Sequence, residues 1–286
     1  MENNLPMKKF ILEIILFLLC INAFGTAQIP DILIYNGDTL SLFDCPLEYY
    51  HDLELIRPKS LFGGNGCLYT ACYRNYVATW KIENNKLYLV QIRNACYPTD
   101  SKYVAASLQE NSDSIGKEYA DLKSLFTGQY KDGKVFADWV NIKMISPVGK
   151  LLFYIHDGFE SIFEKEIEFT LVNGIVTSTQ EYDNSKTKIS KYNSDPKLLV
   201  DFLKNNIDYS NVPEPPEKIR IVIRIMGSTE NGKVDGVSIL KGYNEPYNNE
   251  ALRVVNSIPE WDVLYRHGKK FSIPWMLSVT FEPKKK

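Results

Sequence analysis

The chain has 286 residues, of which 44% are hydrophobic, 13% aromatic and 24% charged. These fractions are close to those of globular proteins and exclude disordered and fibrous classes, while the length favours two domains. The formal net charge of -2 leaves no basic surplus to attract phosphate backbones, so nucleic acid is not an expected partner.

Residues 1–27 have the features of a signal peptide. Two lysines precede an apolar stretch from Phe10 to Phe24, and Gly25-Thr26-Ala27 places small residues before a cleavage site. The stretch is about 15 residues long and includes Glu13, whereas a membrane-spanning helix needs about 20 apolar residues. We therefore expect cleavage and a periplasmic mature protein. The alternative is an uncleaved inner-membrane anchor, and membrane contact is expected only in that case.

Four cysteines follow this segment: Cys45, Cys67, Cys72 and Cys96. An even number in an exported chain indicates disulfide bonds, and four cysteines allow three connectivities among which the sequence does not choose. Cys67–Cys72 is a plausible short-loop pair, with Cys45–Cys96 as its complement. A metal site would need four ligands in fixed geometry, and no histidine lies beside Cys67 and Cys72. We therefore expect four oxidised cysteines and no metal.

Residues 28–180 are expected to form a β-rich domain of unknown function. The apolar-aromatic runs Tyr76–Ile82 and Leu87–Ile92 are joined by four polar residues, which predicts a hairpin. Apolar and mostly acidic residues alternate from Phe163 to Leu171, which predicts a half-buried strand with an acidic outer face. A helix starting near Ser112 is predicted from four apolar residues at helical spacing: Ile115, Tyr119, Leu122 and Phe126.

A polar stretch over residues 177–196 has no apolar period and predicts a boundary loop, so we assign 181–197 as a linker. The second domain, 198–286, begins in a short helix for which Pro196 suits the first position. That helix presents an apolar face made of Leu198, Leu199, Phe202 and Leu203.

Three strands and a helix follow. Isoleucine alternates with other residues over Ile219–Ile225, and Asn231-Gly232 supplies positive φ for a turn into Val234–Leu240. A helix is predicted with Pro246 in its first turn and Pro259 at its end, and one of its faces is made of Tyr247, Ala251, Val254, Val255 and Ile258. The last strand, Phe271–Phe281, again has period two. The expected fold class is α+β, with a β-rich first domain and then a three-stranded antiparallel sheet with helices on one face.

The second domain also carries a set of motifs in a fixed order. They are Phe202–Tyr209, Gly232-Lys233-Val234, Val237–Gly242, Glu250–Trp261 with its helix-Pro-x-Trp element, Gly268–Phe271 and Val279-Thr280-Phe281. With these motifs, about residues 198–281 resemble the C-terminal domain family of TonB-type energy transducers. The first domain resembles uncharacterised bacterial envelope proteins at Thr70–Trp80 and Phe136–Trp139, which implies no activity.

The chain departs from the TonB family in two respects. Family members usually carry Pro shortly after the motif Trp, whereas Asp262 and Val263 follow Trp261, so a differently shaped turn is expected. A transducer also needs an uncleaved membrane helix and a long Pro-rich spacer, and only the short Pro cluster at 213–216 is evident.

The resemblance implies a partner-binding strand. In the family, the strand matching Phe271–Phe281 receives a receptor peptide, and this role falls here on Trp275, Met276, Leu277, Ser278 and Val279. An edge strand can accept an extended peptide through its unpaired backbone groups. The alternation places Met276 and Ser278 outward. In the alternative, Pro274 and the upstream helix cover this edge.

No residue cluster indicates catalysis. His51, His156 and His267 are scattered, and Gly63–Gly66 lacks the Lys-Ser/Thr pair of a phosphate loop. We therefore expect no enzyme activity and no cofactor. The favoured function is a periplasmic binding or adaptor protein that engages an envelope protein or an outer-membrane receptor peptide. The alternative is a membrane-anchored TonB-type energy transducer for outer-membrane transport.

Overall fold

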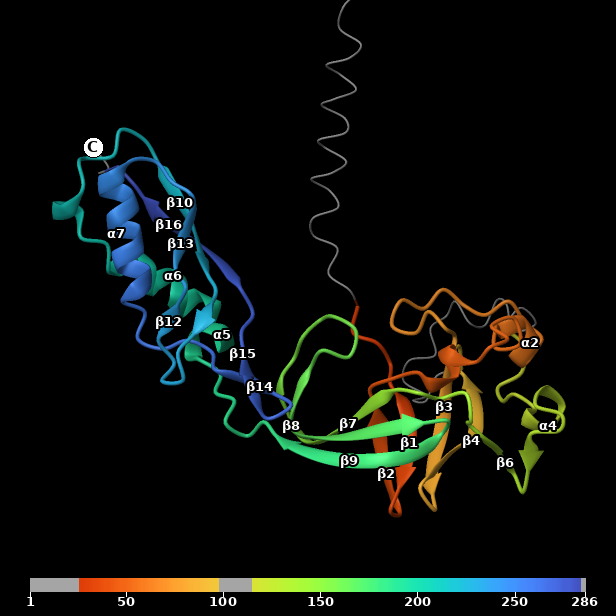
Figure 1. Ribbon diagram of the computed structural model, residues 1–286. Coiled ribbons are helices and arrows are strands. Elements are labelled where there is room, and N and C mark those ends of the chain that lie inside the picture. Colours follow the sequence, from red (N-terminus) through yellow and green to blue (C-terminus); the bar gives the residue numbers. More distant parts are fainter. Residues whose placement is uncertain (1–25, 98–114, 284–286) are drawn as a thin grey trace, which may run out of the picture. The chain divides into compact units, whose positions relative to one another are not determined.

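The computed structural model describes residues 26–97 and 115–283 (Figure 1). The signal peptide expected over 1–27 therefore lies almost entirely outside the described residues. The fold is α+β, with more strand than helix and several sheets. None of the helices in the described residues has both the length and the apolar composition that a membrane-spanning segment requires.

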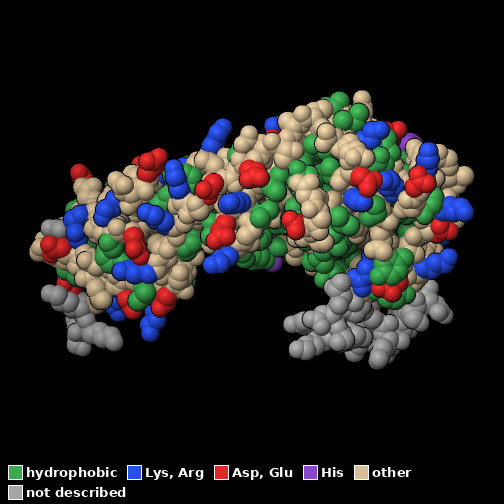
Figure 2. Space-filling model, turned by 90° about the horizontal axis from the view of Figure 1, so that it is seen from below, with side chains coloured by type: hydrophobic (Ala, Val, Ile, Leu, Met, Phe, Trp, Pro, Cys, Tyr) green, Lys and Arg blue, Asp and Glu red, His purple; other side chains and the backbone are tan. Residues whose placement is uncertain are grey.

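The chain forms two compact units. The N-terminal unit contains the described residues up to Ile142, together with Tyr154–Ser161 and Val172–Val176. The C-terminal unit contains Lys143–Phe153, Ile162–Leu171 and the residues from Thr177 on. On the face shown in Figure 2, basic and acidic side chains are interspersed over both units.

A sheet forms the centre of the N-terminal unit. Its strands are β1 (Asp31–Tyr35), β2 (Asp38–Leu42), β3 (Tyr76–Glu83), β4 (Lys86–Asn94), β5 (Tyr130–Lys131) and β6 (Lys134–Phe136). The order is β2-β1-β3-β4 with β6 beside β4, and only β1 and β3 run parallel. The expected β3–β4 hairpin is confirmed. Its turn is only Asn84 and Asn85, with φ of 50° and 57°, values that asparagine tolerates well.

Three short helices lie outside this sheet: η2 (Pro46–Tyr49), α2 (Pro58–Phe62) and α4 (Leu122–Leu125). The single helix expected from Ser112 to Phe126 is not continuous over the described residues, because Ile115 and α4 are helical but the residues between them are not. Gly116 has φ of 78°, and a Cβ there would lie 2.3 Å from the Phe62 carbonyl oxygen, so the chain turns instead of continuing a helix. Tyr119 is half exposed and bridges to Arg93 of β4, and α4 begins only after its Asp121 cap.

Three long strands belong for most of their length to the C-terminal unit: β7 (Lys143–Phe153), β8 (Ile162–Val172) and β9 (Ile175–Asp183), in the order β9-β8-β7. The strand expected over 163–171 is confirmed as β8, but its outer face is not uniformly exposed. Glu166 is 4% exposed because the turn at His267 covers it, and the His267 backbone N–H donates to Glu166 Oε2 at 2.9 Å.

The boundary loop expected over 177–196 has regular structure. β9 continues to Asp183, and the remainder contains α5 (Lys191–Ser194) and the start of α6 (Pro196–Asn205). The assigned linker, 181–197, therefore holds a strand end and two helix segments.

The rest of the C-terminal unit is a three-stranded antiparallel sheet with helices packed on one face. Its strands are β10 (Ile219–Ile225), β13 (Ser238–Lys241) and β16 (Trp275–Phe281), in the order β13-β10-β16. The helices are α6 and α7 (Glu245–Asn256), and the predicted α7 face is buried throughout. Smaller elements are η5 (Tyr209–Asn211), β11 (Gly227–Ser228), β12 (Val234–Asp235), β14 (Leu264–Arg266) and β15 (Lys269–Phe271). The core cluster combines Leu203 of α6, the isoleucines of β10, the α7 face and Leu277, Val279 and Phe281 of β16.

The residues after Trp261 tie the preceding segment to this domain. Asp262 accepts hydrogen bonds from Ser190 N at 2.7 Å and Asn193 Nδ2 at 2.6 Å. Val263 and Lys188 exchange two backbone hydrogen bonds of 2.8 and 2.9 Å. A proline at either position could not donate as Val263 does or accept as Asp262 does. The unusual sequence here thus anchors the chain between β9 and α6.

Candidate functional site

The strand expected over Phe271–Phe281 is shorter than predicted, because β15 ends at Phe271 and only β16 (Trp275–Phe281) continues; β16 lies at the edge of its sheet. β16 pairs over its whole length with β10, from Trp275 opposite Ile225 to Phe281 opposite Ile219. In the part of the chain that the structure describes, no strand pairs with its other side. Pro274 precedes β16, so every residue inside the strand keeps its N–H group. The outer edge therefore offers backbone donors and acceptors.

The side chains of β16 alternate as expected. Leu277 and Val279 are buried in the core cluster and Trp275 packs against it, whereas Met276 is 70% exposed. Ser278 is half-buried, and its Oγ accepts a hydrogen bond of 2.8 Å from Arg220 Nε. The core side is thus fixed by packing while the opposite face of the strand remains accessible.

The end of β16 shows which N–H groups point away from β10. The N–H of Glu282, the next residue, donates to Tyr209 Oη at 3.4 Å, outside the β10–β16 ladder. Because the direction of N–H groups alternates along a strand, we expect those of Met276, Ser278 and Thr280 to point the same way. Tyr209 limits the accessible part of this edge at its C-terminal end.

The sheet around this edge is basic. The sequences of β10, β13 and β16 contain no Asp or Glu. Arg220 and Arg224 on β10 and Lys241 on β13 are exposed. A strand added beside β16 would lie about 10 Å from β10, roughly the Debye length at 0.1 M salt, so acidic residues in it would be weakly attracted.

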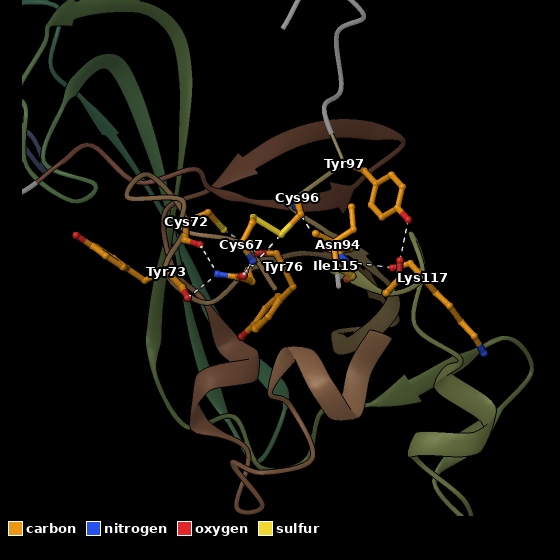
Figure 3. The surroundings of a disulfide bond; sticks show 11 residues. Cys67, Cys72, Tyr73, Tyr76, Asn94, Cys96, Tyr97, Ile115 and Lys117 are labelled. Carbon is orange, nitrogen blue, oxygen red and sulfur yellow. Dashed lines mark hydrogen bonds between the residues drawn. A yellow bond between two sulfur atoms is a disulfide. The ribbon is translucent and has the colours of Figure 1, made fainter. Parts of the chain in front are cut away.

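The cysteines pair differently from the expectation. Cys67 is bonded to Cys96, with 5.8 Å between their Cα atoms (Figure 3). Cys45 and Cys72 are free. The hairpin explains the pairing, because Tyr76 lies opposite Asn94 and so brings Cys96 to the loop before β3. Asn75 Oδ1 accepts from Cys67 N at 2.5 Å, which holds Cys67 there. The Cys67–Cys72 and Cys45–Cys96 pairs, and four oxidised cysteines, were therefore wrong.

The two free thiols are poor nucleophiles. Burial raises the pKa of both Cys45 and Cys72, which disfavours the reactive thiolate. The Cys72 thiol instead donates to the Tyr76 carbonyl oxygen at 3.2 Å. These environments suit structural thiols.

The histidines lie in three separate environments. His51 contacts the ring of Tyr50, His156 hydrogen-bonds the Tyr154 hydroxyl at 2.8 Å, and His267 packs edge-on to Tyr182. Across the described ranges, no group of three or more His, Cys, Asp or Glu residues could hold a metal ion.

A buried charged network in the N-terminal unit was not predicted from the sequence. Asp31 is fully buried and accepts from Arg74 Nη2 at 2.9 Å, Trp80 Nε1 at 2.9 Å and Ala78 N at 3.0 Å. Burial raises the pKa of Asp31, and these three donors oppose the shift. A signal was available, because Asp31 stands at the first position of the otherwise apolar strand Asp31–Tyr35.

A comparison with protein-family models, curated proteins and solved structures finds no match to this chain.

Proposed function

We propose that this chain is an exported periplasmic binding or adaptor protein, and not an enzyme, whose C-terminal unit captures an extended peptide of an envelope protein by strand addition along β16. The observation that carries the proposal is the edge position of β16, with one side paired to β10 over seven residues and no partner strand on the other among the residues described. The resemblance to the TonB C-terminal domain family supports the same strand.

Backbone pairing accounts for how one edge could hold peptides of different sequence. Main-chain hydrogen bonds supply affinity in strand addition, and side chains beside the edge supply selectivity. Here those side chains are the exposed Met276, the half-buried Ser278 and, one strand further, Arg220 and Arg224. The favoured partner is therefore an extended segment with an apolar residue beside Met276 and acidic residues nearby, for example an outer-membrane receptor peptide.

The test distinguishes the contribution of the β16 backbone to peptide binding from that of its side chains. Met276→Pro and Ser278→Pro each remove an N–H expected at the open edge, while Met276→Ala and Ser278→Ala keep it. A photocrosslinker at Thr280 of the full mature chain, exposed to envelope extract, should give adducts that both proline variants lose. Ser278→Ala should retain these adducts, and Met276→Ala should reduce but not abolish them, because it removes a side-chain contact and keeps the backbone N–H. Hydrogen exchange of the β10 peptides checks that the sheet remains folded. Folded proline variants that still give every adduct would contradict strand addition at β16.

A crosslinker at Leu240 is the matched control for the sheet edge. Leu240 is half exposed on β13, at the opposite edge of the same sheet. Adducts found there and not at Thr280 would assign binding to the other edge.

The compartment has its own test. A mature chain that begins near Gln28 would support the periplasmic adaptor. Retention of Phe10–Phe24 in an inner-membrane fraction would favour the membrane-anchored energy transducer instead.

A further inference from the structure

The N-terminal unit contains an open pocket of about 300 Å³. Among the residues that line it are Cys45, Glu48, Arg57, Tyr73, Arg74 and Phe159. This volume is at the lower end of the range found for small-molecule sites. The lining combines two guanidinium groups, one carboxylate and two aromatic rings.

Arg74 has hydrogen-bonding capacity that the protein does not use. Its side chain is 7% exposed, and both hydrogen bonds it makes within the described ranges leave from Nη2, to Ile29 O at 2.8 Å and Asp31 Oδ1 at 2.9 Å. Its Nε has no partner among the described residues. A guanidinium has five N–H donors, so the two on Nη1 remain available to a ligand, whereas Nε is buried and its N–H is left unsatisfied.

The charge of Arg74 persists in spite of its burial. Burial is the largest single influence and lowers its pKa, but Asp31 and other neighbouring groups together raise the pKa overall. The Cys45 thiol beside it stays neutral, because burial raises its pKa, and so adds no negative charge to the pocket. The floor of the pocket thus presents a permanent cation.

Arg57 can supply a second cationic contact. It pairs with Glu48 at 3.3 Å, but the two side chains are 38% and 34% exposed. Exposed pairs of this kind contribute little to stability, so a ligand can redirect Arg57 at small cost. Glu48 keeps another partner, because its Oε1 accepts from the Tyr76 hydroxyl at 2.6 Å.

The aromatic rings define the other half of the pocket. Tyr73 is 68% exposed, a high value for a tyrosine. The ring of Phe159 stacks on the ring of Phe43, with 5.3 Å between the ring centroids. A planar carboxylate can accept two parallel hydrogen bonds from a guanidinium group. An apolar group of a ligand that packs against an exposed aromatic ring buries apolar surface, which favours binding.

We infer that this pocket is a binding site for a small organic anion, with the anionic group at Arg74 and Arg57 and an apolar group against Tyr73 and Phe159. The site is independent of the β16 edge and does not rest on the proposed strand addition. A carboxylate and a phosphate share the anionic chemistry, and the experiment distinguishes them.

The probes are benzoate, its neutral analogue benzamide and inorganic phosphate, titrated into the full mature chain and followed by NMR. Benzoate should shift the resonances of the pocket residues in a saturable manner, and benzamide should not. Benzamide that binds as well as benzoate would overturn the role of the cations. Phosphate that saturates the pocket when benzoate does not would overturn the apolar half of the assignment.

Two variants test the cations. Arg57→Gln should weaken benzoate binding roughly tenfold, since it removes a charged hydrogen bond. Arg74→Lys keeps a charge opposite Asp31 but loses the planar donor array, and should weaken binding at least as much. Arg93→Gln is the matched control, because Arg93 pairs with Glu118 at 3.2 Å in the same unit and does not line the pocket. Equal affinity of wild type, Arg57→Gln and Arg74→Lys, or no saturable binding at all, would overturn the site.

Discussion

In the N-terminal unit a charged pair, Asp31 and Arg74, lies inside the core, whereas the core cluster of the C-terminal unit is built from sheet and helix side chains that are all hydrophobic. The buried carboxylates of the C-terminal unit serve its connections instead. Glu250 accepts from Asp208 N at 2.7 Å, and Asp262 accepts from Ser190 N. One unit thus uses buried charge to align strands, and the other uses it to hold loops and helix ends.

The difference shows where each unit is vulnerable. A hydrophobic cluster loses stability gradually as its side chains are shortened, because neighbouring side chains relax. Removal of one partner of a buried ion pair causes a large loss of unfolding free energy in a single step, because the other partner remains charged and unsolvated.

The largest expected effect is that of Asp31→Ala. It leaves Arg74, Trp80 Nε1 and Ala78 N without their acceptor, and should destabilise the N-terminal unit by about 3–5 kcal/mol. Hydrogen exchange by mass spectrometry should be faster than in wild type for the β1 and β3 peptides and unchanged for the β10 peptides. The double variant Asp31→Leu/Arg74→Met should lose less than Asp31→Ala. A single variant as stable as wild type would refute the buried pair.

The disulfide gives the next largest effect, again confined to the N-terminal unit. Cys67→Ala/Cys96→Ala opens a loop with a sequence separation of 29, which should cost roughly 3–4 kcal/mol in unfolding free energy. Cys45→Ser is the control that changes a free thiol. Titration of the denatured, non-reduced mature protein should find two thiols. Four thiols, or none, would contradict the Cys67–Cys96 pairing with two free cysteines.

The same contrast explains what the sequence could predict. In the C-terminal unit the isoleucines of Ile219–Ile225 and the apolar face of α7 repeat at the periods of a strand and a helix, so the sheet and its buried face were predicted from residue spacing alone. The alternation of β16 likewise predicted that Met276 is exposed. That β16 forms a sheet edge depended on strand order, which residue spacing does not encode.

The N-terminal unit was less predictable because its decisive contacts join residues far apart in the chain. Arg74 and Asp31 are 43 residues apart, and Cys67 meets Cys96 only through the register of the β3–β4 hairpin. The spacing of Ile115 and Tyr119 is typical of one face of a helix, but Gly116 adopts a positive φ, so the chain does not continue as a helix between them. The Arg74 pocket follows from these long-range contacts and had no local motif.

A smaller effect is expected from shortening the C-terminal core. Ile223 is fully buried in β10, and Ile223→Val removes one methylene group, which should cost about 1 kcal/mol. The control is Val222→Ala on the opposite, partly exposed face, which should change stability by less than Ile223→Val does. Denaturant unfolding of both variants checks this order. A loss of several kcal/mol for Ile223→Val would show that this core is as sensitive as the ion pair.

The smallest effect concerns a surface pair of the N-terminal unit and depends on pH. Glu83 hydrogen-bonds Lys134 and Lys81, which lowers the pKa of Glu83 from 4.5 to about 2. Because the pKa of Glu83 is lower in the folded than in the unfolded state, its ionised carboxylate stabilises the fold. This contribution is fully present above pH 4.5 and is lost as the pH falls towards 2. Glu83→Gln should therefore flatten the decline in unfolding temperature over that interval. Because the carboxylate is exposed, 1 M salt should remove most of the difference between the two proteins. A variant whose unfolding temperature is offset from wild type equally at pH 7 and pH 3 would show that Glu83 acts through the shape of the hairpin and not through its charge.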